Sequence, residues 1–149
     1  MEFNGSSGSP LTALAVERDD SLVAGTRRLR ILLVDDEADM LLLLQAMLSN
    51  SHWEVLGKAL TAEDALRMAP ELEPDVAVVD YMMPGMHGFD LAGELKALHP
   101  NCTVIIFSAF DVEQEARAHP HVDQFLSKTK IGRLEQLLLD LGLEKGLFD

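Results

Sequence analysis

Four apolar runs in this chain each end on side chains that can do chemistry. These side chains are three carboxylates, a hydroxyl and an ammonium: Asp35 and Asp36, Asp80, Ser108, and Lys128. Carboxylates brought close together repel one another unless a cation lies among them, and an all-oxygen cluster with room for water suits Mg²⁺. A metal and a lysine could neutralise the oxygens of a phosphoryl group while one carboxylate attacks it. The residue types therefore indicate a phosphoryl-transfer site with Mg²⁺ as its cofactor.

Asp80 is the acid that we expect to be the nucleophile. It follows the apolar run 76–79 and is followed at once by a turn that contains Pro84, Gly85 and Gly88. Such a turn breaks the strand and lifts the carboxylate onto a loop at the edge of the sheet. Among the three acids, only Asp80 has this setting. An acid placed in this way can act as a nucleophile, a metal ligand or both.

The elements that would position these residues alternate between strands and helices from residue 29 onward. Strands apolar on both faces predict a parallel sheet that is covered by helices on each side. Five such units match the flavodoxin-like, doubly wound (βα)₅ sandwich with strand order 2-1-3-4-5, in which functional groups gather at the carboxyl ends of the strands. The expected strands are 30–34, 53–59, 76–79, 102–107 and 124–127, and the expected helices are 38–48, 61–69 (ended by Pro70), 89–98, 112–118 and 131–141.

Length and composition set the limits for the rest of the chain. We expect a disordered tail with linker-like and cloning-derived sequence at 1–28, one folded domain at 29–142 and a C-terminal tail at 143–149. No apolar stretch is long enough to cross a membrane, and the single Cys102 cannot form an internal disulfide, which fits a reducing cytoplasm. A formal net charge of −13 argues against a nucleic-acid-binding surface, because phosphate contacts need clustered Lys and Arg. We therefore expect a cytoplasmic domain without membrane insertion and without direct contact to nucleic acid.

The four segments together resemble the signatures of the receiver domains of two-component response regulators, the CheY-like family. The segments are Val-Asp-Asp-Glu at 34–37, Asp-Tyr-Met-Met-Pro-Gly-Met at 80–86, Ser-Ala at 108–109, and Lys128. The resemblance covers about residues 29–142. It implies that Asp80 accepts a phosphoryl group from a phosphohistidine on a sensor histidine kinase or phosphotransfer protein, and that a downstream effector or output domain reads the result.

The resemblance also implies a division of roles within the site. Asp36 and Asp80 would bind Mg²⁺ directly, Asp35 mainly through water, and Met82 through its backbone carbonyl. Ser108 and Phe125 would form a coupled switch in which the hydroxyl moves toward the phosphoryl group and the ring turns inward. Phe125 has a simpler interpretation as an ordinary core residue.

Three features depart from the family pattern. Thr129 follows Lys128 where the family usually has proline, often after a cis bond, so we expect a trans bond and a less firmly placed Lys128. The segment from Ser108 to Lys128 is about two residues short, and His119-Pro120-His121 replaces the usual small-residue turn. This favours a short or irregular fourth helix, so the usual dimer face should not be assumed. His87 stands where the family often has Asp or Asn.

Each signature residue also has an ordinary structural interpretation. Asp35 and Asp36 could be a solvated loop or a helix cap, Asp80 a turn residue, Ser108 a strand-end hydroxyl and Lys128 a surface lysine. Four such accidents at successive strand ends, in receiver order, would be rare. Two other functions stay open: an aspartyl-phosphate phosphatase of the haloacid dehalogenase type, disfavoured by Met82 where a second acid is needed, and a pseudo-receiver that works without phosphorylation.

Overall fold

A parallel five-stranded sheet forms the centre of the computed structural model, which describes residues 26–148. The strand order is β3-β2-β4-β5-β6, which is the order 2-1-3-4-5 counted along the chain, and all four pairings are parallel. The flavodoxin-like prediction is therefore confirmed. The strands are β2 (Leu29–Val34), β3 (Trp53–Ala59), β4 (Val76–Val79), β5 (Thr103–Ser108) and β6 (Gln124–Ser127).

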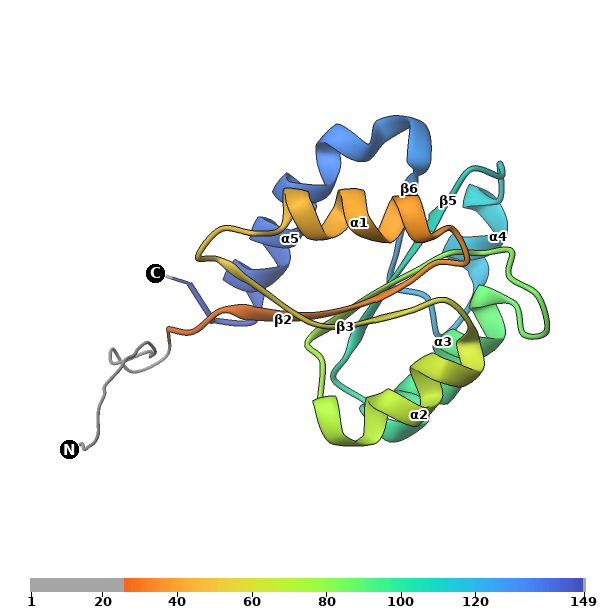
Figure 1. Cartoon of the computed structure of the whole chain (residues 1–149), viewed down its shortest axis with the longest axis horizontal. Helices are drawn as coiled ribbons and strands as arrows, with labels where there is room; N and C mark the ends of the chain where they lie inside the picture. The colour runs from red at the N-terminus through yellow and green to blue at the C-terminus, as the bar shows by residue number, and fades with distance from the viewer. Residues whose placement is uncertain (1–25, 149) are drawn as a thin grey trace. The chain divides into compact units, whose positions relative to one another are not determined.

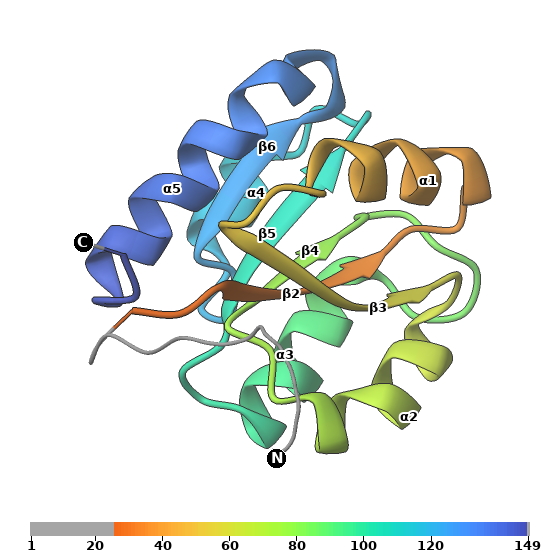
Figure 2. The same cartoon turned by 60° about the vertical axis from the view of Figure 1, so that its left-hand side comes forward.

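Helices cover both faces of this sheet. Figure 1 places α1 (Ala38–Met47) on one face and α2 (Ala62–Leu72) and α3 (Gly88–Leu98) on the other, and Figure 2 shows the same layers after a 60° turn. Since side chains alternate along a strand, Leu32, Val34 and Val79 point to the side of α2 and α3, where they join Leu91 and Leu95 in one buried cluster. β4 is buried at all four positions, as expected for a central strand with helices on both faces.

The second helix differs from the expectation at its C-terminal end. Thr61 caps its N-terminus, with Oγ1 accepting a hydrogen bond from the Asp64 N–H at 3.1 Å. The expectation that Pro70 ends the helix was wrong, because α2 continues through Pro70 to Leu72. Proline removes one N–H donor, and here the helix still closes with Glu73 in the left-handed region (φ 51°).

The C-terminal part of the fold differs more from the prediction. α4 (Glu113–Ala118) has only six residues, which confirms the expected short fourth helix. The final helix, expected at 131–141, is α5 (Leu134–Glu144), and a 3₁₀ segment, η1 (Lys128–Arg133), precedes it. Ser127 starts this tight turn by accepting a hydrogen bond from the Thr129 N–H at 3.2 Å, which delays the α-helix by three residues.

The chain divides into two compact units. Residues Leu29–Leu137 form the larger unit, which holds the whole sheet, and the described parts of the smaller unit are residues 26–28 and 138–148. Within the smaller unit, the Arg27 N–H donates to the Leu147 carbonyl at 3.0 Å. Residues 1–25 of the predicted tail lie outside the described residues, and the domain boundaries 29–142 stay a prediction. No helix among the described residues is long and apolar enough to span a membrane.

Candidate functional site

The parallel sheet brings the residues singled out by the sequence to one edge. Asp35 directly follows β2, Asp80 directly follows β4, Ser108 ends β5, and Lys128 directly follows β6. Backbone hydrogen bonds continue past the strand ends and hold both acids in register. The Asp35 N–H donates to the Ala59 carbonyl at 3.0 Å, and the Asp80 N–H donates to the Val34 carbonyl at 2.9 Å. The backbone of the sheet thus fixes the main-chain positions of Asp35 and Asp80, from which the two carboxylates extend.

Three carboxylates meet at this edge. One oxygen from each of Asp35, Asp36 and Asp80 lies within 4.8 Å of the others. Asp35 and Asp80 are buried, whereas Asp36 is exposed and opens the group to solvent. The Asp35 Oδ1 accepts a hydrogen bond from the Glu37 N–H at 2.9 Å, which ties the acidic turn to the start of α1. This is an oxygen-only donor set with one solvent-facing side, which is the kind of site that Mg²⁺ occupies.

Lys128 lies among these acids. Its Nζ is 2.7 Å from Asp35 Oδ2, 3.5 Å from Asp80 Oδ2 and 3.7 Å from Glu37 Oε1. Burial by itself lowers the pKa of this ammonium, but the hydrogen bond and charge of Asp35, together with the charges of Asp80 and Glu37, raise the pKa above its usual 10.5. Lys128 is therefore a permanent positive charge at the site.

The Lys128–Thr129 bond is trans, as expected, because no cis peptide bond occurs among the described residues. The expectation that a trans bond would leave the lysine less firmly placed does not match the geometry. The side chain of Lys128 is only 11% exposed and lies within hydrogen-bond distance of Asp35. Its ammonium also lies over the Phe107 ring, 5.9 Å from the centroid, at the distance of a cation–π contact.

Asp80 has an unusual protonation equilibrium. Burial, reinforced by the negative charges of Asp35 and Asp36 and opposed by Lys128, raises the pKa of Asp80 from 3.8 to about 6. Three carboxylates beside one lysine also leave the site with an excess of negative charge. A carboxyl pKa perturbed in this way is typical of functional sites.

Ser108 and Phe125 lie on neighbouring strands behind the acids. Ser108 is fully buried, and its Oγ accepts a hydrogen bond from the Phe110 N–H at 2.9 Å. Phe125 pairs with Ile106 across β5 and β6, is partly buried and packs against the main core cluster. The ring is therefore not fully exposed, but the same packing also fits an ordinary core residue. The switch role of this pair stays a prediction.

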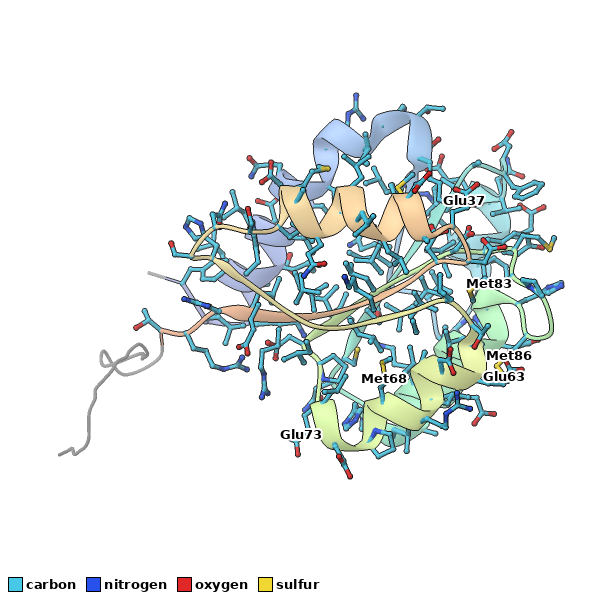
Figure 3. All side chains as sticks on the ribbon, viewed as in Figure 1. Glu37, Glu63, Met68, Glu73, Met83 and Met86 are labelled. Carbon is cyan, nitrogen blue, oxygen red and sulfur yellow. The ribbon has the colours of Figure 1, made fainter. Side chains whose placement is uncertain are left out.

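Two residues near the site were missed by sequence reasoning. Glu37, which Figure 3 labels at the start of α1, adds a fourth carboxylate to the site, and its Oε1 lies 3.7 Å from the lysine ammonium. Its position directly after Asp36 was the available signal. Gly88 is the second residue, because a Cβ there would lie 2.3 Å from the Asp80 carbonyl oxygen, and its N–H donates to the Tyr81 carbonyl at 2.7 Å. The glycine lets the start of α3 pack directly against the backbone of Asp80.

Comparison with known proteins identifies the class of this domain. The family model of the response regulator receiver domain matches residues 31–139. The match covers most of the chain and includes every residue of the site described above. The chain therefore belongs to the response regulator receiver domain family, and the resemblance suggested by the sequence is confirmed.

Individual relatives agree with this assignment. The chain is 36% identical over 80 residues to the chemotaxis protein CheY of Thermotoga maritima, a match that covers 54% of this chain and 67% of that protein. It is 33% identical over 88 residues to a protein-glutamate methylesterase/protein-glutamine glutaminase of Geobacter metallireducens, covering 58% of this chain but only 25% of that protein. A crystal structure of the response regulator TrrA from Thermotoga maritima, in complex with Mg²⁺-BeF, has a TM-score of 0.68 and 26% identity, covering 75% of this chain and 97% of TrrA.

Proposed function

We propose that this domain accepts a phosphoryl group on Asp80 from a phosphohistidine of a sensor histidine kinase or phosphotransfer protein. The observation that carries the proposal is the position of Lys128, whose ammonium lies 3.5 Å from Asp80 and 2.7 Å from Asp35 in an otherwise acidic, largely buried site. A lysine in this place can neutralise phosphoryl oxygens as they approach a carboxylate nucleophile. The domain would then be a signalling switch, and its site would catalyse only the phosphorylation of the domain itself.

The same site fits Mg²⁺. Asp35, Asp36 and Asp80 supply oxygen donors within 4.8 Å of one another, and the one lysine beside them leaves the group with an excess of negative charge. We propose that Asp36 and Asp80 bind the ion directly, Asp35 through water, and Met82 through its backbone carbonyl. When bound, Mg²⁺ would supply positive charge to the phosphoryl oxygens.

In the transfer step, an Asp80 carboxylate oxygen forms a bond to phosphorus while the bond from phosphorus to the imidazole nitrogen breaks, and the imidazole keeps the electron pair. Asp80 must be ionised for this attack, and a pKa of about 6 leaves it mostly ionised at neutral pH. Lys128 stays protonated throughout and contacts the incoming oxygens. Ser108 would then donate its hydroxyl hydrogen to the phosphoryl group, and its oxygen can still accept the Phe110 N–H, because a hydroxyl donates and accepts at the same time.

The consequence for the protein would be a shift between two conformations. We propose that phosphorylation moves Ser108 toward Asp80 and turns Phe125 inward behind it, which changes the surface seen by a downstream effector or output domain. Phe125 is already partly buried against the core, and this position supports the proposal that its ring turns inward. The domain would work in the cytoplasm and would leave any DNA contact to another domain.

Intact mass measurement after incubation with acetyl phosphate tests the proposal. The wild-type protein should gain one phosphoryl group in the presence of Mg²⁺ and none in EDTA, and Asp80→Asn should gain none in either condition. Glu71→Gln, an exposed change on α2, is the matched control and should behave like wild type. A wild-type protein that gains no phosphoryl group with Mg²⁺ would favour the pseudo-receiver instead.

A phosphatase of the haloacid dehalogenase type is not supported by the site. That chemistry needs a second acid two residues after the nucleophile to protonate the leaving group. Here the position is held by Met82, an apolar side chain that is 40% exposed. Steady-state release of inorganic phosphate from a phosphomonoester would contradict this conclusion.

A further inference from the structure

A groove lies beside the phospho-acceptor loop, on the side of α3. It has a volume of about 520 Å³ and runs between the first turns of α3 and the loop that joins α4 to β6. None of its lining residues belongs to the group of Asp35, Asp36, Asp80, Ser108 and Lys128. Its lining consists of two glycines, two apolar side chains, two acids and two histidines: Gly85 and Gly93, Met86 and Phe89, Asp90 and Glu94, and His119 and His121. Figure 3 labels Met86 at this end of the molecule.

The groove is negatively charged on one wall. Asp90 and Glu94 are four residues apart on α3, so they share one face of the helix at a spacing of about 6 Å. Both are exposed, and neither forms an ion pair with a described residue. The cations of α3 and α4 are already used, since Lys96 pairs with Asp123 at 2.6 Å and Arg117 pairs with Glu113 at 2.6 Å. The two carboxylates therefore remain available to a partner.

Aromatic rings from α3 and from the loop that joins α4 to β6 line the same groove. The Phe89 and His119 rings lie 5.0 Å apart and the His119 and His121 rings 5.7 Å apart, measured between centroids. The backbone N–H of His121 donates to His119 Nδ1 at 3.2 Å, which fixes the orientation of the His119 imidazole. Gly93 forms an open floor, because a Cβ there would meet only the His121 ring at 3.8 Å. Ring faces and carboxylates that line one groove are suited to a planar cation.

We propose that this groove is a docking site for an arginine-containing segment of a partner protein. A guanidinium can stack on an aromatic face and donate to a carboxylate at the same time, whereas a lysine ammonium lacks the planar surface. The spacing of Asp90 and Glu94 fits two arginines one helical turn apart, and the net charge of −13 attracts a basic partner over a longer range. The proposal is independent of whether Asp80 is phosphorylated.

A titration followed by amide chemical shifts tests the docking site in the protein as it stands. The probe is a synthetic acetylated peptide, Gly-Arg-Ala-Ala-Arg-Gly-amide, added in EDTA at low ionic strength. The expected result is saturable shifts at the amides of Gly85, Gly93 and His121. The same peptide with both arginines replaced by citrulline keeps the shape and loses the charge, and it should not produce these shifts.

Variants assign the binding to the groove. Asp90→Asn combined with Glu94→Gln should weaken binding about five- to tenfold, which corresponds to the loss of two exposed charge contacts. The control combines Glu54→Gln with Glu71→Gln, which removes the same charge from exposed positions on β3 and α2, and should change affinity less than twofold. Gly93→Leu fills the floor and should abolish binding while the melting temperature is maintained or raised.

Three results would overturn the proposal. The first is equal weakening by the two double variants, which would mean that net charge alone attracts the peptide. The second is a set of shifts confined to Asp35, Asp36 and Asp80, which would place the peptide in the metal site. The third is binding that depends on protein concentration, which would mean that a second copy of this chain occupies the groove.

Discussion

Asp80→Asn should stabilise the metal-free domain, although it removes the residue on which the proposed function depends. The pKa of Asp80 rises from 3.8 to about 6 on folding, so the folded protein binds this proton more tightly than the unfolded chain does. Stability from this group is therefore complete below about pH 4 and falls as the pH rises through 6. At higher pH the folded domain holds an ionised carboxylate that burial and the neighbouring acids disfavour.

The size of the effect follows from the pKa. At about 1.4 kcal/mol for each pH unit, the rise corresponds to roughly 3 kcal/mol of destabilisation when Asp80 is fully ionised. An asparagine removes the charge but leaves a buried amide with imperfect partners, so part of this gain is lost. Lys128 keeps its 2.7 Å contact with Asp35 in the variant. We expect a net gain of about 1 to 2 kcal/mol in mildly alkaline buffer.

Urea unfolding in EDTA, repeated from about pH 4 to about pH 8, measures this quantity. The difference between variant and wild type should be small at the acid end and should grow as the pH passes through 6. Asp123→Asn is the matched control with the same change of charge. It should destabilise the domain, because it removes an acid that pairs with Lys96 at 2.6 Å and accepts the Val104 N–H at 2.8 Å. A difference for Asp80→Asn that is negative, or that is constant across the pH range, would refute the reasoning.

Three further comparisons, which use four substitutions, test the close approach of α3, the role of Lys128 and the cap of α2. Gly88→Ala should destabilise the domain by about 2 to 4 kcal/mol, because its Cβ would lie 2.3 Å from the Asp80 carbonyl oxygen. Gly93→Ala in the same helix should instead stabilise the domain by about 0.5 to 1 kcal/mol. Thermal unfolding of the two variants measures both effects, and equal effects would contradict the role of the close approach. Lys128→Met should lower the free energy of unfolding by about 2 to 3 kcal/mol in EDTA at neutral pH, where the raised pKa keeps the lysine charged. Saturating Mg²⁺ should recover part of this loss. Urea unfolding with and without the ion measures both values, and an equal loss in the two conditions would refute the expectation. Thr61→Ala should lower the free energy of unfolding by about 1 kcal/mol, because it removes the cap of α2. Labelling by acetyl phosphate should not change. A loss of labelling in a folded variant would show that the cap contributes to the site.

The fold could be predicted because its signals are local and repeated. Each strand is an apolar run bounded by turn residues, and the rule that strands of this kind form parallel sheets fixes which ends meet. The errors lie at element ends. Pro70 was expected to end α2, but one missing hydrogen bond near a helix end does not outweigh the packing of the helix on the sheet. The delayed start of α5 depends on the Ser127 cap, which is set by the particular geometry after β6.

The membership of the site could be predicted, but its energetics could not. Asp35, Asp36, Asp80 and Lys128 meet because strand ends meet, which topology alone requires. The raised pKa of Asp80 depends on how deeply the carboxylate is buried, and the sequence does not report burial at a strand end. The contribution of Glu37 depends on side-chain reach across the site. Such quantities need coordinates because electrostatic energies change steeply with distance and exposure.

The position of Lys128 bears most directly on whether the domain can be a working receiver. Two sequence features leave a pseudo-receiver open: the short fourth helix, and Thr129 in place of proline, because a displaced lysine would leave a phosphoryl group without a counter-charge. In the structure the turn after β6 is held differently: Ser127 Oγ accepts the Thr129 N–H at 3.2 Å and lies 2.9 Å from the Thr129 hydroxyl. The bond after Lys128 is trans, and the ammonium lies 2.7 Å from Asp35 and 3.5 Å from Asp80. A threonine after the lysine is therefore compatible with an ammonium that contacts the Asp80 carboxylate, which is what the proposed phosphoryl transfer needs.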